Sequence, residues 1–138
     1  LTMKQYLTFF LLAATVLLLS ACMSKSWTPT AETTPVIKKL LPDKAKELFG
    51  NNSSYVLIDV REPYEYAEGH IPNAVNIPLS GIVKGVNDLG LDKESSAIVV
   101  YCRSGRRSAE AATALSNAGY KNLFDLGGII DWPYEIEK

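Results

Sequence analysis

Histidine and cysteine are scarce in this chain, whose 138 residues include one histidine, His70, and two cysteines, Cys22 and Cys102. A structural zinc site uses four ligands, drawn mainly from these residue types. We therefore expect no metal site, and we expect no bound cofactor.

Excess charge of either sign is also absent. The chain has 14 basic and 15 acidic residues and a formal charge of −1, so it has no extended basic field. Nucleic acid is therefore not an expected partner. With 47% hydrophobic residues in 138, the chain can bury one core but is too short for two ordinary domains. We expect a single globular domain that acts as a monomer.

The strongest apolar run lies near the N-terminus. Lys4 is followed by the uncharged stretch Gln5–Ser24, which contains the run Phe9–Leu19 and ends in small residues. This layout is typical of a secretory signal peptide, which we assign to residues 1–21. The alternative is an uncleaved transmembrane anchor, although a spanning helix needs about 20 apolar residues and this run is shorter. In both cases the rest of the chain is exported.

The segment ends in Leu19-Ser20-Ala21-Cys22, which resembles the bacterial lipobox. The resemblance implies that Cys22 is acylated and becomes the first residue of the mature protein. Acyl chains would then anchor it to a membrane, because each buried CH₂ adds roughly 0.8 kcal/mol. Residues 22–35 are rich in Ser, Thr and Pro and have no apolar period, so we expect a flexible, lipid-anchored tether.

This anchor places the protein in the bacterial cell envelope, on the periplasmic face. The outer membrane is favoured over the inner one, because Met23 follows Cys22 where inner-membrane retention is associated with aspartate in some Gram-negative bacteria. Acylation of Cys22 also removes it from any disulfide. Cys102 then remains as the only free thiol of the mature chain.

From residue 36 onward, strand and helix patterns alternate. Apolar runs predict strands over 36–41, 55–60, 74–77, 97–101 and 122–126, and helices are expected over 42–49, 63–68, 80–88 and 108–118, with a last one after Gly128 that Pro133 disturbs. This alternation predicts an α/β domain over 36–138, with a parallel sheet covered by helices on both faces. Ligands of such sheets bind at the carboxyl ends of the strands.

Cys102 lies at such an end, in the segment Cys102-Arg-Ser-Gly-Arg-Arg-Ser108 between a predicted strand and a predicted helix. The first N–H groups of a helix and its dipole favour an anion, and three arginines add to the same field. Both effects favour the thiolate, which is the nucleophilic form of cysteine. The alternative is an inert buried cysteine that packs like alanine.

Three separated segments resemble the rhodanese-like sulfurtransferases, over essentially all of 36–138. They are Asp59–Pro78, which contains Asp-Val-Arg-Glu-Pro and Gly-His-Ile-Pro, then Val99–Ser108 with the cysteine loop, and then Leu126–Trp132. The resemblance implies a five-stranded parallel sheet with helices on both faces and a persulfide on Cys102. The implied reaction moves a sulfane sulfur from thiosulfate or another persulfide donor to a thiol or cyanide-like acceptor.

The loop has the composition of an anion-binding cradle. The backbone N–H groups of Arg103, Ser104, Gly105, Arg106, Arg107 and Ser108 would surround a persulfide anion. Gly105 permits the backbone angles of a tight turn. The arginines at 103, 106 and 107 are candidates to bind an anionic donor and the departing sulfite, and the sequence does not distinguish among them.

Asp59 is a charged group near the end of the predicted strand 55–60, and Arg61 directly follows that strand. They are candidates for a catalytic acid and base, but charged groups in this position more often form ion pairs and loop hydrogen bonds, so we expect them to support the loop. His70 lies in the Gly-His-Ile-Pro turn. We expect it to stabilise that turn through a hydrogen bond rather than to shuttle protons.

Two other functions are alternatives to a sulfurtransferase. The first is a non-catalytic rhodanese module that binds a partner or carries sulfur, although such modules usually lack the loop cysteine that this chain retains. The second is a phosphatase or arsenate reductase. That branch of the superfamily uses a longer loop with arginine six residues after the cysteine, whereas this chain has Ser108 there, so the loop length argues against this alternative.

Overall fold

A computed structural model describes residues 37–51 and 54–138 of the chain. The predicted signal peptide, Cys22 and the predicted tether lie outside these residues. Among the described residues, no helix is both long and apolar enough to span a bilayer.

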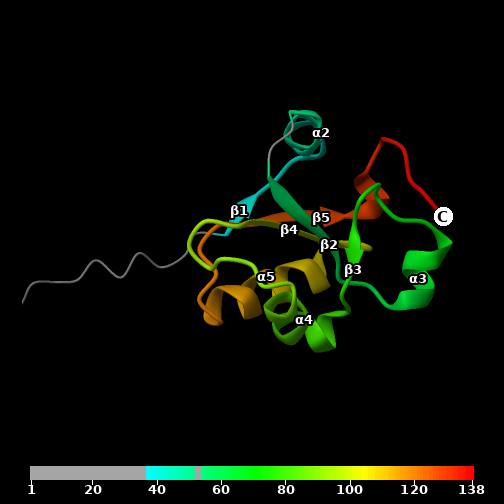
Figure 1. Cartoon of the computed structure of the whole chain (residues 1–138). Coiled ribbons are helices and arrows are strands. Elements are labelled where there is room, and N and C mark those ends of the chain that lie inside the picture. The colour runs from blue at the N-terminus through cyan, green and yellow to red at the C-terminus, as the bar shows by residue number, and fades with distance from the viewer. Residues whose placement is uncertain (1–36, 52–53) are drawn as a thin grey trace, which may run out of the picture. The chain divides into compact units, whose positions relative to one another are not determined.

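The described residues form a five-stranded sheet in which every neighbouring pair is parallel, in the order β1-β5-β4-β2-β3 (Figure 1). The strands are β1 (Lys38–Lys39), β2 (Tyr55–Asp59), β3 (Val75–Asn76), β4 (Ala97–Cys102) and β5 (Leu123–Gly128). The helices are α2 (Pro42–Gly50), α3 (Pro63–Glu68), α4 (Ile82–Asp88) and α5 (Arg106–Asn117), with single 3₁₀ turns η1 (Leu79–Gly81) and η2 (Ile129–Asp131). The predicted α/β class and the parallel sheet are confirmed.

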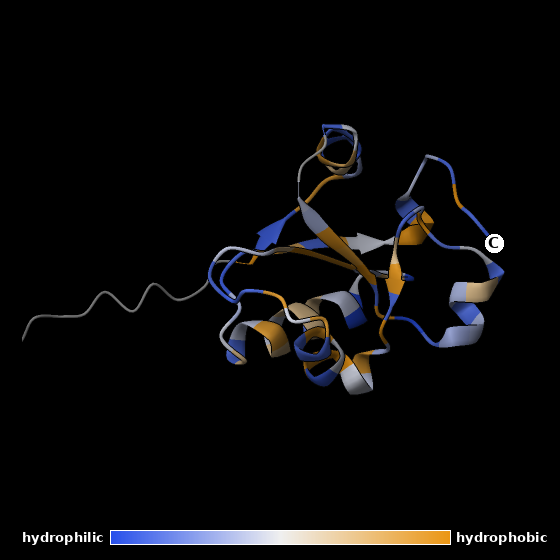
Figure 2. Ribbon diagram, in the orientation of Figure 1, coloured by the Kyte–Doolittle hydropathy of each residue, from blue (hydrophilic) through white to orange (hydrophobic). Residues whose placement is uncertain are grey.

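Helices cover both faces of the sheet, with α2 on one side and α4 and α5 on the other (Figure 1). Successive side chains of a strand point to opposite faces, so Val99 and Tyr101 pack on the α2 side, whereas Val100 and Cys102 pack on the α5 side. The hydropathy colours follow this arrangement, with β2 hydrophobic in the interior and β1 hydrophilic at the edge (Figure 2).

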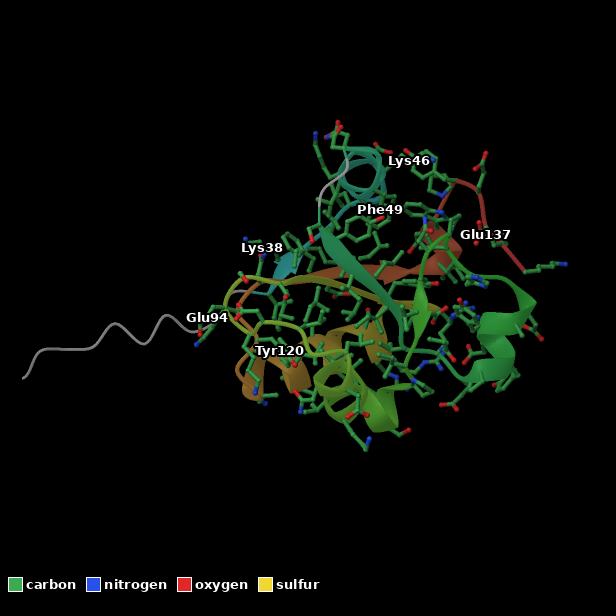
Figure 3. All side chains as sticks on the ribbon, viewed as in Figure 1. Lys38, Lys46, Phe49, Glu94, Tyr120 and Glu137 are labelled. Atoms are coloured by element: carbon green, nitrogen blue, oxygen red, sulfur yellow. The ribbon has the colours of Figure 1, made fainter. Side chains whose placement is uncertain are left out.

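Two aromatic residues mark the two layers of the core. Phe49, a residue of α2, and Tyr120, which follows α5, belong to the two different core clusters, and their rings lie on opposite sides of the sheet (Figure 3). The Tyr120 hydroxyl donates a hydrogen bond to Asn87 Oδ1 at 2.8 Å, which ties the end of α4 to the segment after α5. This bond therefore links α4 and α5, whose buried residues share one core cluster.

Several boundaries differ from those expected. β1 contains two residues rather than the expected 36–41, and the expected helix over 80–88 is divided into η1 and α4. The helix expected after Gly128 is only the single turn η2. Pro133 explains this, because the residue before a proline disfavours helical angles, and Trp132 is extended with φ −84° and ψ 109°.

Candidate active site

Cys102 is the last residue of β4, the middle strand of the sheet, and it lies beside Gly128 at the end of β5. It is a free cysteine and only 1% exposed. Its Sγ accepts a hydrogen bond from the N–H of Gly105, with an N to S distance of 3.0 Å. The predicted position at the carboxyl end of a strand is therefore correct, and a main-chain donor contacts the sulfur.

The turn after Cys102 aims the start of α5 at the sulfur. Gly105 has φ +104°, a left-handed angle that glycine adopts without strain, and α5 begins at Arg106, two residues earlier than expected. The N–H groups of Arg106, Arg107 and Ser108 are thus the first three of the helix and lack intrahelical acceptors. Among the described residues, no hydrogen bond uses them. The loop therefore retains free donors for an anion.

Ser108 contributes its N–H to this cradle, whereas its hydroxyl is used inside the protein. The side chain is fully buried, and its Oγ donates toward the carbonyl oxygens of Gly105 at 3.0 Å and of Gly127 at 3.3 Å. The hydroxyl therefore braces the loop against β5.

The end of β5 packs directly against the first residues of the loop, Arg103 and Ser104. A Cβ on Gly128 would lie 2.4 Å from the carbonyl oxygen of Arg103 and 2.7 Å from the Cα of Ser104, so only glycine fits there. The N–H of Ile130 donates to the same Arg103 oxygen at 3.2 Å. From the sequence, Gly128 was expected to precede a last helix and belongs to the segment Leu126–Trp132, without a predicted role in the loop. The signal that could have revealed this role is the glycine pair itself, because glycine is required where two backbones approach closely.

Arg107 forms a two-pronged ion pair with Glu65 of α3. Its two terminal nitrogens donate to the two carboxylate oxygens at 2.6 and 2.8 Å, and the side chains are only 22% and 12% exposed. The hydrogen bond from Arg107 lowers the pKa of Glu65 to about 2. The same bond raises the pKa of Arg107, and a charge on Cys102 contributes in the same direction. Glu65 was not among the predicted site residues.

The other two loop arginines differ from Arg107. Arg106 lies on the surface, where it pairs with Glu110 one turn further along α5 at 2.6 Å, with side chains 73% and 51% exposed. Arg103 is exposed, and the ion pairs of the described residues do not include it. The structure therefore distinguishes the three arginines. Arg107 is bound to α3, Arg106 is paired on the surface, and Arg103 has no carboxylate partner among the described residues.

Asp59 and Arg61 form a buried ion pair. Asp59 is fully buried and accepts from the Arg61 main-chain N–H at 2.9 Å, from Nε at 3.0 Å and from a terminal nitrogen at 2.6 Å. That terminal nitrogen also donates to the carbonyl oxygen of Gly69 at 2.7 Å. The carboxylate and guanidinium satisfy each other, so this geometry fits the expected supporting role. The segment that they hold is the one after α3.

His70 is part of the same support. Its Nδ1 lies 3.1 Å from the carbonyl oxygen of Tyr66, and its ring stacks on the Tyr66 ring with centroids 3.7 Å apart. Its main chain exchanges two hydrogen bonds of 2.8 Å with Glu137. These contacts fit the expected turn-stabilising role and fasten the C-terminal segment to α3.

A cavity of about 330 Å³ lies beside the Arg107–Glu65 pair. Its walls come from α3, from η2 and from the C-terminal segment, and they include Arg61, Glu65, Glu68, Gly69, Ile129, Ile130, Trp132, Tyr134 and Ile136. Over the part of the chain that the structure describes, no group of three His, Cys, Asp or Glu residues is arranged to hold a metal ion. The reactive groups of the site are the Cys102 thiol and the main-chain N–H groups of its loop, and these residues are not part of the cavity wall.

Comparison with known proteins agrees with this geometry. The family model for the rhodanese-like domain matches residues 41–133. The chain is 33% identical over 109 residues to the putative sulfur carrier protein YrkF of Bacillus subtilis, an alignment that covers 78% of this chain and 57% of that protein. It is 32% identical over 98 residues to a sulfurtransferase of Allochromatium vinosum, covering 70% of this chain and 89% of the relative.

A solved structure titled rhodanese with anions from E. coli is 34% identical to the chain, with a TM-score of 0.57, and covers 61% of this chain and 98% of that one. The chain therefore belongs to the rhodanese-like domain family. The names of its relatives support sulfur transfer as the general class of chemistry.

Proposed function

We propose that the protein is a sulfurtransferase in which Cys102 carries the sulfur as a persulfide. The Cys102 thiolate attacks the outer sulfur of a donor such as thiosulfate. A new S–S bond forms on Sγ, and the bond to the sulfite group breaks with its electron pair leaving on sulfite. A thiol or cyanide then takes the outer sulfur and regenerates the thiolate, so the reaction is a two-step exchange with ping-pong kinetics.

One observation carries this proposal. The Cys102 sulfur accepts from Gly105 N–H at 3.0 Å and lies at the start of α5, whose first N–H groups are free. These donors and the helix dipole stabilise negative charge on the thiolate and on the outer persulfide sulfur. A related rhodanese of E. coli has been solved with anions, which supports anion binding by this family.

The direct test is the intact mass of the protein after incubation with thiosulfate. We expect a gain of about one sulfur atom, which dithiothreitol removes and which Cys102→Ser abolishes. The same variant should abolish thiocyanate formation from thiosulfate and cyanide. The matched control is Thr113→Ser, because Thr113 lies on the exposed side of α5. This variant should behave as wild type. Unchanged turnover in Cys102→Ser would contradict the assignment.

A non-catalytic sulfur carrier is the second candidate. The 1% exposure of Cys102 favours it, because a shielded persulfide is well suited to storage, and a relative is named as a putative sulfur carrier. The two functions differ in turnover. A carrier would gain one sulfur atom from the donor and release little of it to cyanide, whereas the enzyme would form many equivalents of thiocyanate.

We also propose that the chain is exported and lipidated at Cys22, on the periplasmic face of a bacterial envelope. The apolar N-terminal run and the segment ending in Cys22 support this location. In a bacterial host that processes lipoproteins, labelled palmitate should be incorporated into the wild-type chain and not into Cys22→Ser. Incorporation into both would contradict the site.

A further inference from the structure

The arginines near the active site are mostly neutralised. Arg61 is paired with Asp59, Arg106 with Glu110 and Arg107 with Glu65. Over residues 37–51 and 54–138, Arg103 is the one arginine of this group with no carboxylate partner. The strongly cationic loop expected from the sequence is therefore much less cationic in the folded protein.

The Glu65 carboxylate is fixed from two directions. Both of its oxygens accept from Arg107, and Oε2 also accepts from the main-chain N–H of Glu62 at 3.1 Å as part of the capping box that begins α3. An arginine fork held by two parallel hydrogen bonds has a defined orientation. Arg107 is thus turned toward α3, and its pKa is raised by Glu65 and, to a smaller degree, by a charge on Cys102.

The wall of the nearby cavity on the α3 side has no unpaired arginine among the described residues. Glu65 and Glu68 lie in its wall together with apolar residues of η2 and the C-terminal segment, and its one arginine, Arg61, is bound to Asp59. Opposite charges attract and like charges repel most strongly where water is partly excluded. A dianion that reaches the Cys102 loop therefore meets an Arg107 whose charge Glu65 already balances.

We propose that Glu65 is a specificity-determining residue that selects sulfur donors by charge, disfavouring the thiosulfate dianion relative to an organic persulfide of low charge. This inference rests on the proposed transfer through Cys102. The Cys102 thiolate attacks the terminal sulfur of R–S–SH, an S–S bond forms, and the bond to R–S breaks with its electron pair. The leaving thiolate then takes a proton, and no further oxidant or reductant is needed.

The test compares two donors with the full chain. Rate constants for sulfur uptake by Cys102 are measured by intact mass with thiosulfate and with an alkyl persulfide that has no other charged group. Glu65→Gln keeps a side chain that suits the capping box but removes the charge. We expect its rate constant with thiosulfate to rise about tenfold and that with the alkyl persulfide to change less than about twofold.

Two further variants separate specificity from structural support. Glu110→Gln removes the same charge from the neighbouring surface pair with Arg106, and we expect the ratio of the two rate constants to remain as in wild type. In Glu65→Gln combined with Arg107→Gln the gain with thiosulfate should disappear, because Glu65 acts through Arg107. Circular dichroism at the assay temperature confirms that each variant is folded.

The outcomes distinguish this inference from the proposed function. If wild type takes up sulfur from both donors and Glu65→Gln leaves their ratio unchanged, or lowers both rate constants equally, Glu65 is only a brace and the inference is overturned. If wild type takes up sulfur from neither donor, the proposed function fails and the inference fails with it.

Discussion

The α-carbon of Gly128 lies so close to the carbonyl oxygen of Arg103 that a methyl group there would be 2.4 Å from that oxygen. This contact joins the end of β5 to the first residue of the Cys102 loop. The end of β5 therefore limits where the loop can lie, and the shape of the cradle depends on Gly128 as well as on the loop itself.

Gly128→Ala should distort this loop. Because the methyl group would meet main-chain atoms, the strand or the loop must shift, at a cost of about 1–3 kcal/mol of stability. We expect sulfur uptake by Cys102 to fall at least tenfold, measured by intact mass, with a lower urea midpoint. Gly81→Ala is the control, since a Cβ there meets nothing within 4 Å. Normal uptake in Gly128→Ala would show that the contact does not shape the cradle.

Ser108→Ala should loosen the same loop. Its buried hydroxyl serves the carbonyl oxygens of Gly105 and Gly127, and loss of a buried partner costs about 1–3 kcal/mol. We expect faster hydrogen exchange in residues 103–108 and slower sulfur uptake. Thr113→Ala removes an exposed hydroxyl from the same helix and should change little. Equal effects of the two substitutions would contradict a special role for Ser108.

Asp59→Asn tests the buried ion pair. It leaves Arg61 as a buried charge without its partner, so we expect a loss of about 3–5 kcal/mol in the free energy of unfolding, measured in urea. The folded fraction should still form the persulfide, because Asp59 is fully committed to Arg61. Asp88→Asn, at an exposed pair with Lys84, should cost under about 1 kcal/mol. A folded Asp59→Asn protein with no sulfur uptake would instead indicate a chemical role.

The ion pair of Glu65 with Arg107 should make the free energy of unfolding depend on pH. Its pKa is about 2 in the folded protein and lies near 4.5 when unfolded. The ionised carboxylate therefore contributes stability that is fully present above about pH 4.5 and is lost as the pH falls toward 2. We expect wild type to lose about 1–2 kcal/mol more than Glu65→Gln between pH 6 and pH 3, measured by urea unfolding. Parallel pH profiles would contradict the pairing.

The sequence was sufficient to predict the position of Cys102. A run of apolar residues ending at a cysteine, followed by a glycine-containing turn and small residues, contains local information about strand, loop and helix. Ala111 and Ala112 are fully buried where α5 packs against the sheet. The parallel arrangement follows from the alternation of strands and helices.

The pairing of charges was not predictable in the same way. Arg107 and Glu65 are 42 residues apart, and nothing local indicates that they meet. Arg106 and Arg107 are adjacent in sequence but point to different partners because successive helical residues lie about 100° apart around the axis. The role of Gly128 also depends on a contact between distant segments. These features can be recognised only once the fold is known.

The two outermost strands, β1 and β3, contain two residues each, and β1 consists of Lys38 and Lys39, which are both exposed. Short edge strands, one of which consists of lysines, offer few free main-chain groups for another chain to pair with. At high protein concentration, copies of the chain should therefore not aggregate by pairing the edges of their sheets.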